Sequence, residues 1–465
     1  MATTLDNIVS LAKRRGFVYP TSAIYGGLTS SYDYGPMGVQ LLRNIKDRWW
    51  RRFISTRRDM VGLDSQILLH PQTWVASGHV TAFNDPLVED KVTHQRFRAD
   101  HLVKTWLELH PSVSLPAGKS LEDLSLPELA EFMSANQVLS PAGNPLTEPK
   151  AFNLLFETAI GTVAGEKSKI YLRGETAQGI FSNFKQVLDS TRIKLPFGIG
   201  QIGKSFRNEI TTGQFVFRTL EFEQAEIEYF FDPSQSSWEE LMHQWQTVIW
   251  DFVVTELGVK AENLRWRQHT DKERSFYSKD TYDLEYKFSF GWSEVWGLAY
   301  RTDYDLQQHM KLSGQDLSYR DPNTNAVFVP HVIEPAVGIN RLFLMCLTDA
   351  YREDAAKERT ILELSPKLAP YLAAVFPLVK NKPEIVEKAQ SIFTQLSNLF
   401  SISWDDRGNI GKRYLSQDEI GTPVCITVDF QTLEDQTVTI RNRTTTDQTR
   451  VAISDLEGIL TNMLR

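Results

Sequence analysis

Apolar residues recur with helical spacing across residues 39–54. The side chains that share one face of this segment are Leu41, Leu42, Ile45, Trp49 and Phe53, and most of the charged residues lie off that stripe. Residues 66–70, which follow, have the composition of a strand and are closed by Pro71. The pattern predicts a long helix and then a strand near the N-terminus.

Residues 198–226 fit two incompatible descriptions of a nucleotide site. Residues 198–205 have the spacing of a P-loop, and their glycines also satisfy G-x-G-x-x-G. Both motifs need a strand before the loop and a helix after it, because the helix N-terminus faces the phosphates. Pro196 precedes the motif and no helical stripe follows Ser205. The P-loop and dinucleotide-binding interpretations are therefore disfavoured.

The same stretch predicts an antiparallel hairpin instead. Residues 206–210 have strand composition, residues 211–213 form a turn signal with glycine, and residues 215–218 begin a second strand-like run.

The polar residues of this hairpin suit a bent nucleotide. Arg207 can donate two hydrogen bonds to an α-phosphate, and Arg218 can reach a terminal phosphate. Phe222 offers a ring face for adenine, and Glu209 can accept a hydrogen bond from its amino group. A solvated amphipathic hairpin is the alternative, but the spacing of Arg218, Phe222 and Glu226 beyond the turn favours a nucleotide site.

The remainder of the chain divides by pattern. Residues 85–165 are more polar, with Pro and Gly interruptions, and predict an insertion. Strand and turn signals resume at 281–341, followed by a helix over 340–351. After residue 357 strands and helices alternate, with a strand at 360–365, a helical stripe from Ile385 to Leu396 and a strand at 424–430. That alternation predicts a separate α/β domain.

Composition narrows the function. The 465 residues carry a net charge of −8, which argues against a broadly basic nucleic-acid coat and against DNA as a partner. Cys346 and Cys425 are isolated in apolar runs and predict core residues rather than zinc ligands. No secretory signal pattern and no run of eighteen apolar residues occurs. We therefore expect a soluble cytoplasmic protein with no membrane partner.

The hairpin resembles motif 2 of class II aminoacyl-tRNA synthetases, and the chain is similar nearly end to end to glycyl-tRNA synthetases of the homodimeric, single-subunit type. The segments that carry the resemblance are Arg15–Pro20, Ile24–Gly27, Asp33–Pro36, Ala76–His79, Glu175–Phe181, Phe206–Glu226, Asp283–Tyr286, Arg301–Asp305, Val332–Pro335 and Gln417–Pro423.

The resemblance implies a fold of the α/β (α+β) type, with an antiparallel class II sheet flanked by helices. The implied divisions are a catalytic domain at 1–84 and 166–356, an insertion at 85–165 and an anticodon-binding domain at 357–465. Motif 1 then covers about 39–71, motif 2 about 204–226 and motif 3 about 334–350. In the family motif 1 forms the dimer interface, although an ordinary core helix explains its periodicity equally well.

The resemblance also implies attachment of glycine to tRNA-Gly through a glycyl-adenylate, with ATP as substrate and Mg2+ beside its phosphates. The catalytic residues are then Arg207, Arg218 and Arg341, with Phe222 and Arg341 on either side of the adenine. ATP would be bound by Arg207, Asn208, Glu209, Phe217, Arg218, Phe222, Glu294, Val295, Gly338, Asn340 and Arg341, and Glu294 would hold the metal.

Glycine would be bound by Arg98, Glu175, Phe222, Glu223, Gln224, Glu226, Arg301, Glu334, Ala336 and Gly338. Among these, Glu175, Glu223 and Glu334 are expected to form an acidic cage around the ammonium group. Two alternatives stay open from the residues alone. The acids could form plain ion pairs with Arg173 or Arg301, and Arg98 could be a solvated surface charge.

Several positions depart from the family pattern. Gly174 stands in place of proline, Leu220 in place of a second arginine, and Ala336 in place of a frequent serine. Leu415 and Ser416 replace an arginine pair, residues 442–444 are less charged than expected, and from Lys357 onward 13 Lys and Arg face 14 Asp and Glu. These departures motivate a second hypothesis, a synthetase-like paralogue that binds ATP and glycine without efficient tRNA charging. A P-loop NTPase, in which Lys204 is essential and Arg341 dispensable, is the third.

Overall fold

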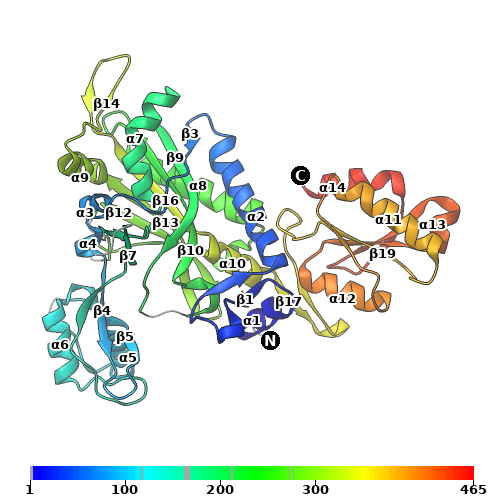
Figure 1. Cartoon of the computed structure of the whole chain (residues 1–465), viewed down its shortest axis with the longest axis horizontal. Coiled ribbons are helices and arrows are strands. Elements are labelled where there is room, and N and C mark those ends of the chain that lie inside the picture. Colours follow the sequence, from blue (N-terminus) through cyan, green and yellow to red (C-terminus); the bar gives the residue numbers. More distant parts are fainter. Residues whose placement is uncertain (1–3, 117–118, 162–167, 211–212, 272, 276) are drawn as a thin grey trace.

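The computed structural model describes residues 4–465 except 117–118, 162–167, 211–212, 272 and 276. Most of the chain forms one large domain, called the body below. The insertion lies at one end of the body, and a smaller C-terminal domain lies on the opposite side (Figure 1). The N-terminal helix α1 (Leu5–Arg14) lies at the junction between the body and the C-terminal domain.

A seven-stranded sheet forms the centre of the body, in the order β11-β12-β13-β16-β10-β9-β3. Neighbouring strands are antiparallel except β3 and β9, which are parallel. The strands are β3 (Met60–Gly62), β9 (Phe197–Phe206), β10 (Glu221–Phe231), β11 (Leu264–Gln268), β12 (Asp280–Phe288), β13 (Gly291–Thr302) and β16 (His331–Gly338). Together with the flanking helices, this sheet confirms the expected fold class.

The two faces of the sheet are covered by different helices, because side chains alternate along each strand. On one face, odd-numbered residues of β10 such as Ile227 pack with α2 (Pro36–Trp50), α8 (Trp238–Asp251) and α10 (Ile339–Ala350). On the other face, Phe230 packs with α7 (Ala177–Thr191) and α9 (Tyr304–Ser313). Residues of β10 with even numbers therefore share the face of α7 and α9.

Smaller elements complete the body. They are β1 (Val18–Pro20), β2 (Tyr32–Tyr34), α3 (Pro71–Ala76), α4 (His79–Ala82), β14 (Tyr319–Arg320), β15 (Val327–Phe328), β17 (Tyr351–Asp354) and β18 (Arg359–Leu362).

The helix predicted over 39–54 is confirmed. Its apolar stripe is buried in the main core, and the helix closes in a π-helical turn at Arg51–Ser55. The strand predicted at 66–70 is wrong. The strand that joins the sheet is β3, upstream of it, and within 66–70 Leu68 makes one isolated bridge and is half exposed. Pro71 begins α3 rather than closing a strand, since proline is tolerated at the first helical position.

The hairpin is confirmed and the P-loop interpretation is excluded. Residues 197–206 form β9, which continues through Ser205, where a P-loop would begin a helix. It pairs with β10 in a register that places Phe222 opposite Ser205. The second strand starts later than predicted, because Phe215–Phe217 forms a 3-10 turn entered through positive φ values at Gln214 and Phe215. The turn predicted at 211–213 falls partly outside the described residues.

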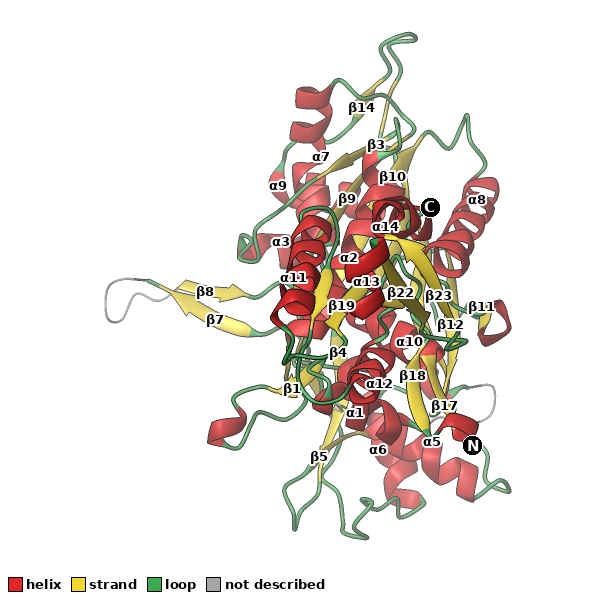
Figure 2. Ribbon diagram, turned by 90° about the vertical axis from the view of Figure 1, so that its right-hand side faces the viewer, coloured by secondary structure: helices red, strands yellow, loops and turns green. Residues whose placement is uncertain are grey.

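The insertion has a core of its own. Its sheet has the order β5-β4-β6, formed by β4 (Asn84–Glu89), β5 (Arg96–Arg98) and β6 (Lys150–Asn153), and it packs with α5 (Ala99–Leu109) and α6 (Leu126–Ala135). Beyond it the hairpin of β7 (Glu157–Ile160) and β8 (Ser168–Tyr171) projects from the molecule (Figure 2). This hairpin extends across the boundary predicted at 165.

The C-terminal domain is a five-stranded sheet in the order β20-β19-β21-β22-β23 with its own core. Its elements are β19 (Ala373–Pro377), α11 (Pro383–Ser397), β20 (Ile402–Trp404), α12 (Ile410–Ile420), β21 (Val424–Val428), α13 (Phe430–Asp435), β22 (Thr437–Asn442), β23 (Gln448–Ala452) and α14 (Leu456–Met463). The strand predicted at 360–365 is present in part, but its assignment to the sheet of this domain is wrong. That segment is β18, which pairs with β17 outside the five-stranded sheet.

Both cysteines are buried and unbonded, as predicted. Among the described residues, no helix combines the length and the apolar character needed to cross a membrane.

Candidate active site

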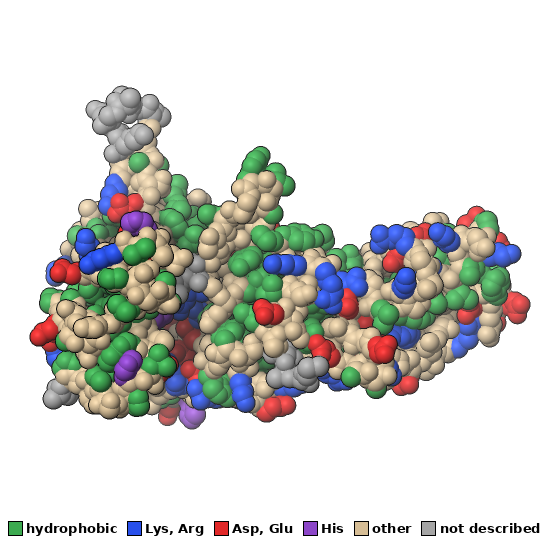
Figure 3. Space-filling view, turned by 90° about the horizontal axis from the view of Figure 1, so that it is seen from below, with side chains coloured by type: hydrophobic (Ala, Val, Ile, Leu, Met, Phe, Trp, Pro, Cys, Tyr) green, Lys and Arg blue, Asp and Glu red, His purple; other side chains and the backbone are tan. Residues whose placement is uncertain are grey.

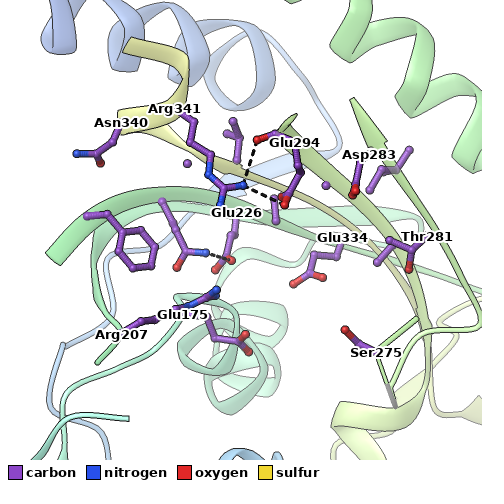
Figure 4. Close-up of a pocket in the computed structure, with 18 of the residues that line it drawn as sticks. Glu175, Arg207, Glu226, Ser275, Thr281, Asp283, Glu294, Glu334, Asn340 and Arg341 are labelled. Carbon is purple, nitrogen blue, oxygen red and sulfur yellow. Dashed lines mark hydrogen bonds and ion pairs between the residues drawn. The ribbon is translucent and has the colours of Figure 1, made fainter. Parts of the chain in front are cut away.

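A cavity of about 300 Å³ opens on the α7 and α9 face of the sheet, over β10, β13 and β16. In the space-filling view, acidic and basic side chains gather in a hollow beside the insertion (Figure 3). The close-up shows Glu175, Glu226 and Glu334 grouped in the middle of the cavity, with Arg207 on one side and Asp283 on the other (Figure 4).

Most of the residues predicted for the site line this one cavity. They are Glu175, Arg207, Glu209, Phe217, Arg218, Phe222, Gln224, Glu226, Glu294, Glu334, Ala336, Gly338, Asn340 and Arg341. These residues come from segments more than a hundred positions apart in the chain, and the order of the strands is what brings them together.

The structure corrects the expected position of Glu223, because its carboxylate does not line the cavity. It bonds Lys46 of α2 at 2.9 Å, on the sheet face opposite the cavity. Its neighbours Phe222 and Gln224 line the cavity, and alternation along β10 turns Glu223 the other way. Its own N–H donates to Oδ1 of Asn340 at 2.8 Å. The third carboxylate grouped with Glu175 and Glu334 in the cavity is that of Glu226.

Four further predicted residues do not line the cavity. Arg98 donates to Asp85 at 3.0 Å and also bonds Asp100 within the insertion, so its guanidinium is already satisfied there. Val295 is fully buried in the core on the opposite face of β13. The backbone of Asn208 donates to the carbonyl of Leu154. The fourth, Arg301, lies behind the cavity wall.

Arg301 is a buried hub between two acids. Its guanidinium donates twice to Asp305, at 2.8 Å each, and once to Glu334 at 2.7 Å. The guanidinium carbon also lies 3.8 Å from the ring centroid of Tyr277. Glu334 therefore forms the ion pair with Arg301 that the sequence left open as an alternative, and it also lines the cavity.

Arg173 takes no part in the cage. It donates to the backbone carbonyl oxygens of Lys204 and Ser65 at 2.6 and 2.8 Å, which ties β9 to the segment that precedes α3.

The three cage carboxylates have different electrostatic surroundings. Burial, reinforced by Glu226 and Glu175, raises the pKa of Glu334 to about 8 despite Arg301. Burial and the neighbouring Glu175 also raise the pKa of Glu226. Burial acts in the same direction on Glu175, but His79, with help from Arg301 and Gln178, outweighs it and lowers the pKa of Glu175. Like charges confined in a dry site cannot all be ionised together.

The other end of the cavity carries the cationic and aromatic groups. Nε of Arg207 donates to the Gly174 carbonyl at 3.1 Å, and its guanidinium carbon lies 5.4 Å from the Phe222 ring centroid. Arg341 lies 4.6 Å from the ring centroid of Phe217. Each of these arginines lies against a different ring, and the placement of adenine between Phe222 and Arg341 stays a prediction.

Sequence reasoning missed the wall formed by β11, β12 and the segment between them. Ser275, Tyr277, Thr281, Asp283 and His269 all line the cavity, and Nε2 of His269 lies 2.7 Å from Oδ2 of Asp283. The segment Asp283–Tyr286 was one of the segments that carry the family resemblance, but no function in the site was predicted for it. Along β12 the polar residues at 281, 283, 285 and 287 alternate with apolar residues at 282, 284, 286 and 288, and this alternation was the signal that could have pointed to the cavity.

Two segments match known domain families. Residues 162–351 match the tRNA synthetase class II core domain (G, H, P, S and T), and residues 373–463 match an anticodon binding domain. A glycine–tRNA ligase of Clostridium beijerinckii (strain ATCC 51743 / NCIMB 8052) is 50% identical over 463 residues, 98% of each chain. The chain belongs to the glycine–tRNA ligase family.

Other relatives agree. Glycine–tRNA ligases of Clostridium perfringens (strain 13 / Type A) and Staphylococcus aureus (strain JH9) are 48% and 47% identical, each over 99% of this chain. They cover 98% and 99% of their own lengths. Family membership confirms the resemblance to glycine–tRNA ligases with a class II core. The anticodon-binding match begins beyond β18, in agreement with the boundary of the five-stranded sheet.

The family implies a divalent metal, and the oxygen donors of the cavity fit one. Burial raises the pKa of Asp283, and the nearby Glu294 adds to that shift, so these two carboxylates share a wall and repel each other. The described residues contain no group of three or more metal-binding side chains. Magnesium commonly takes one or two protein carboxylates and completes its shell with phosphate oxygens and water.

Proposed function

We propose that this protein is an AMP-forming ligase that attaches glycine to tRNA-Gly through a glycyl-adenylate. The observation that carries the proposal is the shared cavity, in which three buried carboxylates lie beside Arg207, Arg218 and Arg341. An ammonium group and a polyphosphate need these opposite environments next to each other. The full-length similarity to glycine–tRNA ligases supports the same activity.

The first step is attack of the glycine carboxylate on the α-phosphorus of ATP, with pyrophosphate as the leaving group. The reaction needs alignment and neutralisation of charge more than an enzymic nucleophile. Arg207 is assigned to the α-phosphate, because Gly174 already orients its Nε and leaves the Nη groups available for phosphate oxygens. Arg218 is assigned to the terminal phosphate, and Arg341 with Phe222 to the adenine.

Glycine is held at the acidic end of the cavity. Its ammonium group is assigned to Glu175, Glu226 and Glu334, and this fixes the carboxylate toward the phosphates. Glu226 is itself fixed by the start of α7, where the N–H groups of Thr176 and Ala177 donate to one of its oxygens at 2.7 and 2.8 Å. A rigid cage holds a small cation in one place, which a substrate without a side chain requires.

Magnesium would be held by Glu294 beside the phosphates. When bound, it supplies charge neutralisation on phosphate oxygens. Within the chain, Arg341 keeps that carboxylate ionised. Burial acts to raise the pKa of Glu294, but the adjacent guanidinium lowers it.

In the second step a terminal ribose hydroxyl of tRNA takes the glycyl group from the adenylate and AMP leaves. The C-terminal domain is assigned to the anticodon. We propose a cytoplasmic homodimer in which motif 1, formed by α2 and β3, lies at the contact between subunits. Relatives similar over both the core and the C-terminal domain favour charging over the paralogue hypothesis.

The test is glycine-dependent ATP–pyrophosphate exchange, followed on the same sample by charging of tRNA-Gly. Exchange with charging is the expected result. Exchange without charging would establish the paralogue instead. Absence of exchange with any of the twenty amino acids would refute the assignment of the cavity.

A further inference from the structure

The acidic cage holds more carboxylates than its ligand has charges. Beneath Glu226, on the same face of β10, lies a fourth acid, Glu228, which is fully buried. A glycine ammonium brings a single positive charge, and Arg301 is already shared between Asp305 and Glu334. Some of the acids must therefore hold protons, and the affinity for an ammonium depends on which one stays ionised.

Three of the four acids are poor candidates for the ionised one. Burial, with Glu175 or Glu334 as the nearest like charge, raises the pKa of Glu226 and of Glu228. Burial also raises the pKa of Glu334, even though Nη1 of Arg301 lies 2.7 Å from its carboxylate. The pKa of each of these three acids is therefore shifted toward the protonated form. Glu175 is the exception.

The exception has a structural origin in His79, a residue that does not line the cavity. Nε2 of His79 lies 3.2 Å from Oε2 of Glu175, and both side chains are buried. The second oxygen of Glu175 accepts from Nε2 of Gln178 at 3.0 Å. The carboxylate is thus held from behind at both oxygens.

His79 is itself held in one orientation. Its Nδ1 lies 2.8 Å from the Ser77 hydroxyl, and its ring packs edge-to-face on Trp74 and Phe83 at 5.3 and 5.1 Å between centroids. Nδ2 of Asn153 donates to the carbonyl oxygens of His79 and Val80 at 3.0 and 3.1 Å. The segment Ala76–His79, which the sequence marked without a role, folds around this imidazole.

We propose that His79 is a positioning residue that keeps Glu175 ionised and aimed into the cage, which makes Glu175 the ion-pair partner of the glycine ammonium. The inference rests on the proposed function and deepens it. His79 acts through Glu175 and touches no substrate. A buried imidazole N–H that donates to a carboxylate stabilises its ionised form and fixes its rotamer at the same time.

The test compares His79→Ala and His79→Gln with the wild-type chain in glycine-dependent ATP–pyrophosphate exchange. His79→Ala is expected to raise the KM for glycine by roughly ten- to hundredfold, the usual cost of removing a group that orients a ligand-binding side chain. The KM for ATP is expected to stay within about twofold. His79→Gln keeps a donor near Glu175 and is expected to fall between the two.

The number of protons released when glycine binds distinguishes a positioning role of His79 from a merely structural one. The titratable groups around Glu175 are His79, Arg301, Glu226, Glu334 and Tyr277. Without His79, burial and the like charges shift Glu175 toward its protonated form, so glycine binding must displace a proton from a larger fraction of the molecules. Calorimetric titration of glycine in two buffers of different ionisation heat is expected to show more protons released by His79→Ala than by wild type.

His70→Ala is the matched control, because His70 is exposed at the start of α3 and outside the cavity wall. Thermal melting checks that each variant folds, and His79→Gln carries the test if His79→Ala does not. Wild-type KM for glycine and wild-type proton release in a folded His79 variant would overturn this inference alone. Absence of glycine-dependent exchange in the wild-type chain would overturn the proposed function and this inference with it.

Discussion

Nη1 of Arg341 lies 2.9 Å from Oε2 of Glu294 and donates to the carbonyl oxygen of the same residue at 3.1 Å. The pair joins the start of α10 to β13 across the cavity. It fixes the guanidinium that is assigned to the adenine beside the carboxylate that is assigned to magnesium.

Arg341→Ala is therefore expected to lower the rate of glycine-dependent ATP–pyrophosphate exchange by about a hundredfold or more, the usual effect of removing one preorganised charge from an active site. Lys204→Ala is the matched control. Nζ of Lys204 bonds Glu221 at 2.8 Å on the exposed side of the hairpin and does not line the cavity. Its exchange rate is expected to stay close to wild type. A severe loss in Lys204→Ala with full activity in Arg341→Ala would reinstate a P-loop mechanism.

The buried Glu228 is expected to make the stability of the folded protein depend on pH. Within the described residues, neither oxygen of its carboxylate has a hydrogen-bond partner, and burial raises its pKa well above the ordinary value. A raised pKa gives stability that is complete below the unfolded-state pKa and is lost as the pH rises toward the folded-state pKa.

Glu228→Gln removes the ionisable group and with it the loss of stability at high pH. Melting temperatures are expected to be similar for the two proteins near pH 4 to 5, and higher for Glu228→Gln at pH 8. Differential scanning fluorimetry across this range measures the difference. A variant that is less stable than wild type by the same amount at both pH values would show that Glu228 is ionised in the folded state.

A buried cluster ties the C-terminal domain to the strand that precedes it. Asp418 of α12 is fully buried, bonds Arg441 at 2.8 and 2.9 Å, and accepts from Arg359 of β18 at 2.7 Å. Removing the shared acid leaves the buried guanidinium of Arg441 without its counter-charge, whereas Arg359 keeps Asp354 at 3.1 Å. Breaking a buried ion pair in this way typically costs about 3–5 kcal/mol.

Asp418→Asn is expected to weaken the C-terminal domain and its attachment while the cavity, which lies in the other domain, stays intact. The expected result is near-normal ATP–pyrophosphate exchange with tRNA-Gly charging reduced about tenfold or more, compared in parallel assays. Glu457→Gln, on α14, removes an acid from the same domain and serves as a control. Equal losses in exchange and charging would contradict the division of labour between the domains.

The sequence predicted elements whose signal is local and missed those set by distant packing. The 3.6-residue stripe of α2 and the antiparallel motif 2 hairpin are visible in single segments, and both were correct. The place of β3 was missed, because three residues beside a parallel partner carry no periodic pattern. His269 and Asp283 were missed because their approach depends on the order of β11, β12 and β13.

Glu223 shows a different kind of error. Placing both Phe222 and Glu223 in the cavity conflicts with the two-residue period of a strand, so the sequence itself contained the objection. Strand alternation selects residues 222, 224 and 226 as one set. The partner that confirms the opposite direction of Glu223 is Lys46, which lies far away in the chain on α2.

The cation behind the three cavity carboxylates is an arginine, and the geometry of its contacts explains why another cation would not replace it. Arg301 is almost wholly buried and reaches Asp305 through Nε and Nη2 and Glu334 through Nη1. A lysine carries the same charge but one nitrogen, so it cannot serve both carboxylates in these directions.

In Arg301→Lys, one of the two acids is left buried without a counter-charge. The expected cost is about 3 kcal/mol in the free energy of unfolding, together with a KM for glycine that rises at least about tenfold. If Glu334 is the acid that loses its partner, its pKa rises further above the value of about 8, and the KM for glycine depends more steeply on pH between 7 and 9. Exchange kinetics over that range and chemical denaturation measure both effects. A lysine variant with the wild-type KM, pH profile and stability would mean that the charge behind the cage matters and the fork geometry of the guanidinium does not.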